Sequence, residues 1–338
     1  MFTLEDVSMK NITLADIAAK TGYSINTVSH ALHDKPDISK KTKEYIMKVA
    51  DEVGYIANSS AGALRSGKTK NIAIILGDIS NPYFSIMIKE MENTLRKYDY
   101  SAFIINTDEN QEFEKKAIIS AISRGVDGII ICPVQKSTEN IDFLNEKKIP
   151  YVLIGRRFDE NSNYVVCDDE NGGKIAALRM FSENKHDILF LNGPTYISSA
   201  RERLQGIKNA YKDAKISESK LSIVEIDITN PKKTIEKSLE KHSHCNGIIC
   251  FSDLIAMQVC HCLKSMHIRV PEEVSVIGFD DISSQFYFAT MLSSVTSSKR
   301  KTASTAVEIL MSIISGENNS PKNIILNTKL ILRKTTEK

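Results

Sequence analysis

The chain lacks several features that would assign it to common protein classes. No run approaches the ~20 apolar residues that a membrane span needs, and the N-terminal MFTLEDVSMK has no apolar stretch of signal-peptide length. No GxGxxG motif follows the first predicted strand, and no nucleophile–base motif is visible. We therefore expect a cytoplasmic protein that is not an enzyme.

Cysteine pairs of the CxxC type are also missing. The six cysteines are expected to be reduced in the cytosol; they are Cys132, Cys167, Cys245, Cys250, Cys260 and Cys262. Histidine and cysteine crowd residues 242–267, but their spacing matches no structural zinc pattern. Because Cys250 and Cys260 fall in a predicted strand and a predicted helix, they are expected to act as small buried hydrophobes. The sequence predicts no metal ion and no cofactor.

The charge is small overall but uneven along the chain. The net charge is +2 over 338 residues, of which 25% are charged and 42% hydrophobic. Residues 9–70 hold ten Lys or Arg against six Asp or Glu, whereas residues 71–338 hold thirty-four of each. A basic first part on a neutral body favours nucleic-acid binding by the first part only. The length allows two or three globular units.

The segment TLADIAAKTGYSINTVSHAL, residues 13–32, predicts two short helices joined by a tight turn. Thr13 and Asp16 form a capping-box pattern, and Gly22 stands where the first helix must end. Ser24 can cap the second helix. The predicted inward residues of that helix are Val28 and Leu32, and its outward residues are Ile25, Asn26, Ser29 and His30. The pattern favours a helix-turn-helix over an ordinary helical hairpin.

A third helix and a linker follow. Ser39 can cap a helix that runs to about Val53 and packs on the first two. Its lysines are expected to face solvent or phosphate; they are Lys40, Lys41, Lys43 and Lys48. Residues 57–70 are small and polar, with Leu64 as their single large apolar residue and a basic tail. In isolation this stretch predicts a flexible linker.

From Asn71 onward, apolar runs alternate with amphipathic helices. Strands are predicted at NIAIIL, SAFIIN, DGIIIC and YVLIG, and in a second series at DILFLN, SIVEI, NGIICF and VSVIGFD. This predicts an α/β fold in which a small all-α headpiece precedes two doubly wound parallel sheets with a cleft between them. Ligands of such sheets bind beyond the carboxyl ends of the strands.

The expected boundaries divide the chain into a headpiece, a hinge and a core. We place the headpiece at 9–56, the hinge at 57–70 and the core at 71–338. Within the core, subdomain one is expected at about 71–163 and 294–322, and subdomain two at about 164–293 and 323–338.

Three motifs in order resemble the DNA-binding headpiece and hinge of the lactose-repressor family: TLADIAAKTGYSINTVSHAL, SKKTKEYIMKVADEVGY and NSSAGALRSGKT. The resemblance implies a hinge helix that forms on operator DNA, with Leu64 as a wedge in the minor groove and Ala61 as its packing neighbour. Such a wedge unstacks a base step and bends the DNA onto more protein surface. The implied DNA-binding residues are Thr13, Tyr23, Ser24, Ile25, Asn26, Thr27, Ser29, His30, Ala61, Leu64 and Arg65.

The later motifs NPYF, SRGVDGII, SARERLQG and RVPEEVSVIGFDD resemble the effector-binding core of the same family, which is similar to periplasmic binding proteins. The resemblance implies an aromatic wall, an arginine that grips the effector and an acid that accepts hydroxyl hydrogen bonds, a set that suits a sugar. The implied effector-binding residues are Tyr83, Phe84, Asp108, Arg156, Ser199, Arg203, Ser252 and Asp280. Two alternatives stay open: Arg203 and Asp280 could form a structural ion pair, and Tyr83 and Phe84 could pack into the core.

The resemblance implies a sequence-specific repressor that binds a palindromic operator as a homodimer and responds to a sugar or related metabolite. The C-terminal LILRKTTEK lacks a leucine heptad, so a dimer is expected rather than a tetramer. A regulator controlled mainly by a protein partner is an alternative, because Ser252 and Gly155 stand where many sugar-binding members carry Asn and Asp. A cytosolic solute-binding protein is another, although it would need no headpiece.

Overall fold

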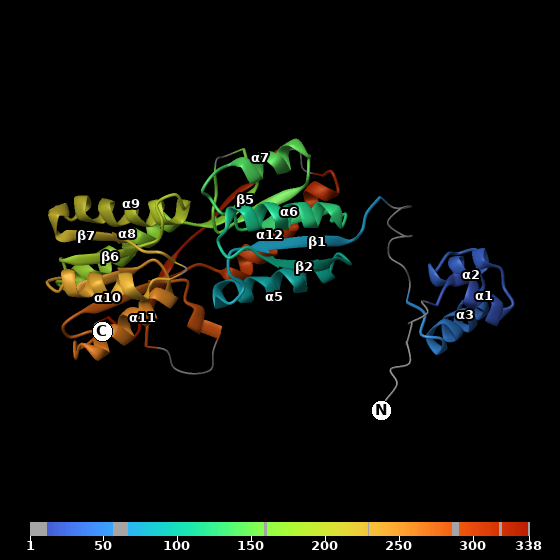
Figure 1. The fold of residues 1–338 in the computed structure, drawn as a ribbon, viewed down its shortest axis with the longest axis horizontal. Coiled ribbons are helices and arrows are strands. Elements are labelled where there is room, and N and C mark those ends of the chain that lie inside the picture. The colour runs from blue at the N-terminus through green and yellow to red at the C-terminus, as the bar shows by residue number, and fades with distance from the viewer. Residues whose placement is uncertain are drawn as a thin grey trace, which may run out of the picture. The chain divides into compact units, whose positions relative to one another are not determined.

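The computed structural model describes residues 12–56, 67–158, 161–228, 230–285, 291–317 and 320–336. They fall into two compact units, one ending at Gly67 and the other starting at Lys68 (Figure 1). The first unit contains the predicted headpiece and the second the predicted α/β core. Within the described ranges, no helix has the length and apolar character needed to cross a bilayer.

The headpiece is a three-helix unit, with α1 at Leu14–Thr21, α2 at Ile25–Leu32 and α3 at Lys40–Glu52. All three predicted starts are confirmed, because Thr13, Ser24 and Ser39 each cap their helix with a side-chain oxygen. Gly22 ends α1 with φ 76°, as the turn requires. The helices enclose a small apolar core of Ile17, Val28, Ala31, Ile46, Val49 and Ala50.

The first lobe of the core is a six-stranded parallel sheet in the order β11-β5-β4-β3-β1-β2. Its strands are β1 (Asn71–Leu76), β2 (Ser101–Asn106), β3 (Gly128–Ile131), β4 (Tyr151–Ile154), β5 (Tyr164–Cys167) and β11 (Asn323–Leu326). Its helices are α5 (Pro82–Arg96), α6 (Gln111–Ser123), α7 (Glu139–Glu146) and α12 (Lys299–Ile314). Alternate residues of β1 enter two separate core clusters, so both faces of the sheet are covered.

The second lobe is a six-stranded sheet in the order β12-β10-β9-β8-β6-β7, parallel except for β12 against β10. Its strands are β6 (Ile188–Asn192), β7 (Leu221–Glu225), β8 (Gly247–Cys250), β9 (Ser275–Phe279), β10 (Ser293–Thr296) and β12 (Lys329–Ile331). Its helices are α8 (Asp169–Ser182), α9 (Ser198–Asp213), α10 (Lys232–Lys241) and α11 (Asp253–Ser265), with short 3-10 turns η1 (Glu218–Lys220) and η2 (Ile282–Gln285). The predicted pair of doubly wound sheets is therefore confirmed.

The chain crosses between the lobes at slightly different points from those expected. β5 and β11 both belong to the first sheet, whereas the expected boundaries assigned residues 164–167 and 323–326 to subdomain two. β10 belongs to the second sheet, so residues 294–296 do not belong to subdomain one. These expected boundaries are wrong because β11 pairs with β5 and β5 pairs with β4. The pairing of β5 with β11 joins segments far apart in the chain, and local sequence does not encode it. Figure 1 shows the resulting return of α12, late in the chain, to the side of α5 in the first lobe.

Candidate functional site

The outward face of the headpiece is formed by α2 and the turn before it. Tyr23 and Ile25 are 39% and 53% exposed, and Ser24 and Asn26 are also exposed. Thr27 and His30 are half-buried. These side chains together offer hydroxyl, amide, imidazole and apolar groups, which is the chemistry that reads base edges in a major groove.

Two residues of the headpiece depart from the sequence expectation. Ser29 is only 6% exposed, so its side chain does not belong to the outward face. The reason is geometric: α2 packs against both α1 and α3, and this wide contact buries Ser29 beside Val28. Lys43, expected to face solvent or phosphate, instead pairs with Asp34 at 2.6 Å between Nζ and Oδ1.

Thr13 and Ser24 are both committed to local structure. Thr13 forms a complete capping box with Asp16, whose carboxylate accepts hydrogen bonds from the Thr13 backbone N–H and hydroxyl at 2.8 and 2.7 Å. The Ser24 hydroxyl accepts from the backbone N–H of Thr27 at 3.1 Å. Both side chains thus hold helix N-termini, where exposed N–H groups and the helix dipole favour a phosphate.

The orientation of His30 is set by a residue outside α2. Its Nδ1 lies 2.6 Å from Oδ2 of Asp37, and this contact lowers the pKa of the Asp37 carboxyl. A carboxylate only accepts, so Nδ1 must carry the proton. In that tautomer Nε2 is an acceptor, which can pair with a base-edge donor such as an adenine or cytosine amino group. Sequence spacing gave no sign of this pair. The predicted hinge residues Ala61, Leu64 and Arg65 lie outside the described residues.

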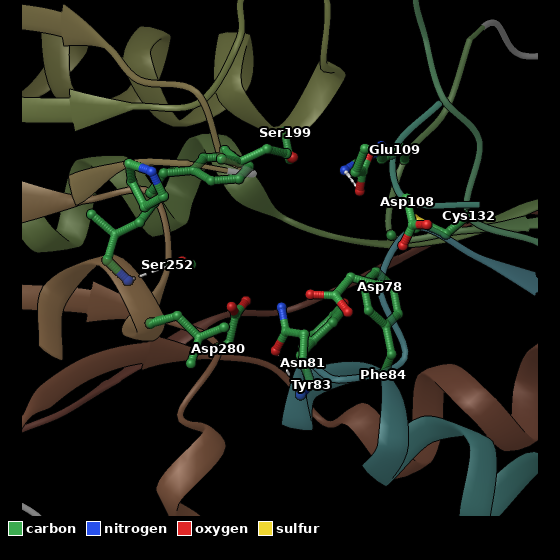
Figure 2. A pocket seen from close by; sticks show the side chains of 18 of the residues that line it. Asp78, Asn81, Tyr83, Phe84, Asp108, Glu109, Cys132, Ser199, Ser252 and Asp280 are labelled. Atoms are coloured by element: carbon green, nitrogen blue, oxygen red, sulfur yellow. Dashed lines mark hydrogen bonds and ion pairs between the residues drawn. The ribbon is translucent and has the colours of Figure 1, made fainter. Parts of the chain in front are cut away.

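A cavity of about 510 Å³ opens between the two lobes of the core, and all eight residues expected to bind the effector line it (Figure 2). The loops after β1, β2, β3, β4, β8 and β9 contribute to it, which places it at the carboxyl ends of both sheets. In Figure 2, Asp108 and Cys132 of the first lobe lie across the open centre from Ser252 of the second. The lining residues that sequence reasoning missed include Asp78, Asn81, Glu109, Phe251, Leu254 and Gln258.

Arg203 is held rigidly at the wall of this cavity. Its Nε donates to Oδ1 of Asp169 at 2.7 Å, and its Nη1 donates to the carbonyl of Phe251. The guanidinium lies over two aromatic rings, with its Cζ 4.8 Å from the centroid of Phe251 and 4.2 Å from that of Phe279. The Nη2 atom donates to no described residue, which leaves it for a ligand. Arg203 therefore forms its ion pair with Asp169. Among the described residues, it does not form the alternative ion pair with Asp280.

Arg156 is neutralised in the same way on the first lobe. Its Nη1 and Nη2 donate to the two carboxylate oxygens of Glu109 at 2.7 and 2.8 Å, and Nη1 also donates to the carbonyl of Pro133 at 2.9 Å. The two side chains are 7% and 9% exposed. Neither Glu109 nor Asp169 was expected in the site, because no motif in the sequence links them to their arginines.

Asp280 lies on a strained loop at the cavity wall. Its φ is 101°, and that of the following Asp281 is 49°, a region that residues other than glycine rarely adopt. Burial raises the pKa of the Asp280 carboxyl, which accepts no hydrogen bond from the described residues. Across the cavity, Asp108 and Glu109 also have positive φ, at 50° and 53°. Such strain gathers at binding sites, where surrounding structure holds it.

Aromatic rings supply the apolar part of the cavity. Tyr83 and Phe84 lie in the first turn of α5 and pack edge to face with centroids 5.2 Å apart. Phe84 is 6% exposed and belongs to the first lobe's core cluster, while half-buried Tyr83 packs against that cluster. Both residues thus join the core, as the alternative allowed, and also line the cavity. Burial raises the pKa of Tyr83 well above its ordinary value.

Hydrogen bonds between the lobes lie beside the cavity. The backbone N–H of Ser198 donates to Oε1 of Gln135 at 2.8 Å, and that of Arg157 donates to the Ser198 hydroxyl at 3.2 Å. Arg157 also pairs with Glu202 at 3.1 Å. These contacts hold the N-terminal end of α9, which carries Ser199 and Arg203, against the first lobe.

Comparison with family models matches nearly the whole chain. Residues 69–334 match the model described as periplasmic binding proteins and sugar binding domain of LacI family, and residues 13–58 match the model described as bacterial regulatory proteins, lacI family.

Two named repressors also align with nearly the full length of this chain. The HTH-type transcriptional repressor PurR of Photobacterium profundum is 26% identical over 329 residues, which are 96% of this chain and 98% of the relative. The ribose operon repressor of Halalkalibacterium halodurans is 26% identical over 325 residues, covering 96% and 97%. The chain is also similar to a LacI transcriptional regulator from Alkaliphilus metalliredigens complexed with D-xylulofuranose, with TM-score 0.71, 27% identity and coverage of 80% and 100%. It shares the fold of the Lac repressor dimer bound to operator and the anti-inducer ONPF, with TM-score 0.84, 20% identity and coverage of 97% and 99%.

Proposed function

Since this chain belongs to the lacI family of bacterial regulatory proteins, we propose that its cavity takes an uncharged, hydroxyl-rich effector of sugar size that sets its affinity for operator DNA. The chain is a DNA-binding transcriptional repressor under effector control. We further propose that it acts in the cytoplasm, as a homodimer on a palindromic operator, and has no enzymatic activity. The observation that carries the effector class is the charge of the cavity wall.

The wall is acidic. Four carboxylates line the cavity against two guanidinium groups, a net charge of −2; they are Asp78, Asp108, Glu109 and Asp280, and Arg156 and Arg203. Both guanidinium groups are already neutralised by buried carboxylates. A phosphate or carboxylate on the effector would face the remaining acids, and each like charge at ~5 Å costs about 3 kcal/mol at an effective dielectric constant of 20. The cavity therefore disfavours anions.

The same wall suits hydroxyl groups and a sugar ring. Carboxylates accept hydrogen bonds from hydroxyls, and Asp280 accepts none from the described residues. The Nη2 of Arg203, the Ser199 and Ser252 hydroxyls and the Asn81 side chain supply donors. The rings of Tyr83, Phe84 and Phe251 offer surfaces for the apolar face of a sugar. A volume of about 510 Å³ lies within the range of ligand sites.

Control of DNA binding requires the effector to distinguish two arrangements of the lobes. Residues from both lobes line the cavity, so a bound effector bridges them. The Gln135–Ser198 and Arg157–Glu202 contacts beside it are those that would re-form or break as the lobes move. An effector that stabilises one arrangement thereby shifts the population that binds the operator.

A thermal-shift screen with matched pairs tests the effector class. Neutral mono- and disaccharides, their phosphate esters, the corresponding uronic acids and amino sugars are each added to the full chain. We expect a neutral sugar to raise the melting temperature, since a ligand at 100 times its Kd adds about 2.7 kcal/mol, and its phosphate ester to have no effect. Stabilisation by the phosphate ester alone would contradict the proposal. Absence of any shift would favour the rival regulator controlled by a protein partner.

Selection from a random pool of double-stranded DNA tests the other half of the function. We expect the full chain to enrich a palindromic sequence, since a two-fold symmetric dimer binds two equivalent half-sites. Enrichment of an asymmetric site, or of none, would contradict a dimeric sequence-specific repressor.

A further inference from the structure

A second cluster of chemically reactive side chains lies at the opposite edge of the second lobe from the cavity. It occupies the turn between α10 and β8, in the sequence His242-Ser243-His244-Cys245. The strand edge here is the amino end of the sheet: Cys245 precedes β8, and Asp187 precedes β6. The cluster is therefore separate from the effector site.

The backbone turn is what brings the three side chains together. The N–H of Cys245 donates to the carbonyl of His242 at 2.9 Å, which closes a four-residue turn. Potential ligand atoms of His242, His244 and Cys245 all lie within 4.8 Å of one another. His244 Nε2 and Cys245 Sγ are 3.7 Å apart. A tetrahedral zinc ion with bonds of about 2.0–2.1 Å to nitrogen and 2.3 Å to sulfur separates the two ligand atoms by about 3.5 Å. The observed spacing thus requires little rearrangement.

The burial of the three side chains and their donor atoms suit a bound cation. Cys245 is 6% exposed and joins the apolar cluster under α10 and α11, so its sulfur is fixed in position. His244 is exposed and His242 is half-buried, so the imidazoles form the solvent side of the cluster. The Asp187 carboxylate acts electrostatically on Cys245 and also pairs with Lys220, at 3.2 Å between Oδ2 and Nζ. Two imidazoles and one thiolate are a donor set for borderline metal ions such as Zn²⁺ or Co²⁺, rather than for Mg²⁺ or Ca²⁺.

We propose that His242, His244 and Cys245 bind one transition-metal ion of the Zn²⁺ class, with a fourth position taken by water. The ion fixes the C-terminal end of α10, a helix whose preceding residue, Pro231, lines the effector cavity. The sequence did not indicate the site because three ligands spread over four consecutive residues match no structural zinc spacing.

Titration of the reduced, metal-free full chain with Co²⁺ tests the site. We expect one equivalent to produce a thiolate-to-cobalt charge-transfer absorption, which Zn²⁺ then displaces. Cys245→Ser should remove that absorption. Cys262→Ser is the matched control, since Cys262 also follows a histidine and is half-buried but lies on α11 outside the cluster, and it should leave the absorption unchanged. Absence of the absorption in the wild type, or its survival in Cys245→Ser, would overturn the site.

A second variant guards against misfolding of Cys245→Ser. His244 is exposed, so His244→Gln should keep the fold, as checked by circular dichroism. Loss of the His244 imidazole should weaken Co²⁺ binding on the order of tenfold or more, since even changes to residues that only support a metal ligand lower metal affinity tenfold to a hundredfold. Unchanged Co²⁺ affinity in this variant would show that the imidazole is not a ligand and would overturn the proposal.

Discussion

Replacement of Arg203 by methionine breaks a buried ion pair while it keeps much of the side-chain volume. Asp169 is 3% exposed, and its carboxylate would lose the Arg203 Nε at 2.7 Å. Removal of one partner of a buried pair leaves an uncompensated charge and costs roughly 3–5 kcal/mol. At roughly 2–4 °C per kcal/mol for a domain of this size, we expect the melting temperature of Arg203→Met to fall by at least roughly 6 °C.

The stability loss of Arg203→Met should become smaller as the pH falls. Burial raises the pKa of Asp169 and Arg203 opposes that rise, so the variant's Asp169 has a folded pKa further above its unfolded value. The folded state then holds its proton more tightly, and stability increases as the pH falls toward the unfolded pKa. The gap between wild type and Arg203→Met should therefore narrow from pH 8 to pH 5.

Two comparison variants, measured by differential scanning calorimetry, test whether the buried ion pair causes the stability loss of Arg203→Met. Arg201, two residues earlier on α9, is exposed and donates to the carbonyls of Thr195 and Tyr196, so Arg201→Ala should cost about 1 kcal/mol or less. The double variant Arg203→Met with Asp169→Asn removes both charges and should be more stable than Arg203→Met alone. Equal losses at Arg203 and Arg201, or no recovery in the double variant, would refute the buried-pair account.

Three further predictions follow from particular contacts. Burial raises the pKa of Glu114 from 4.5 to about 7, so the folded state holds the proton of this carboxyl more tightly than the unfolded state does. Between pH 8 and pH 4.5, the unfolding free energy of the wild type, measured by urea titration, should therefore rise by about 3 kcal/mol relative to that of Glu114→Gln. A Cβ on Gly206 would overlap the backbone carbonyl of Glu170 on α8, so Gly206→Ala should lower the unfolding free energy by about 1–3 kcal/mol and weaken effector binding through displacement of α9. A decrease in unfolding free energy below 0.5 kcal/mol, within the ~0.5 kcal/mol scatter of neutral changes, would contradict the close helix packing. Asp37→Ala should lower the ratio of specific to non-specific DNA affinity roughly fivefold, because His30 loses its fixed tautomer. Asp34→Ala is the control, because it also removes one negative charge but Asp34 pairs with Lys43; an equal effect in that variant would rule out a role for the His30 contact.

The sequence predicted the headpiece helices, eight of the strands and eight of the residues that line the cavity, because these depend on local pattern and recognised motifs. Capping residues at Thr13, Ser24 and Ser39 mark helix starts directly, and the continuous apolar run of β1 has few alternatives to a buried strand. The predicted effector-binding residues follow strand ends or lie on α5 and α9, so a correct topology brings them to the cavity.

What could not be predicted depends on tertiary contacts between distant segments. Asp169 and Glu109 lie 34 and 47 residues from the arginines they neutralise, and neither stands in a recognisable motif. The pairing of β5 with β11 spans about 160 residues and decides where the chain crosses between lobes. Burial of Ser29 depends on how widely α2 contacts its neighbours, which helical periodicity alone does not give.

The central claim is that occupancy of the cavity controls binding to the operator. Fluorescence anisotropy of the selected operator, titrated with the full chain with and without a saturating sugar that raises its melting temperature, measures this coupling directly. The account predicts that the sugar changes the Kd for the operator by about 5- to 150-fold and that the operator changes the sugar's Kd by the same factor. An operator Kd that stays the same in the presence of a sugar that binds the protein would contradict it.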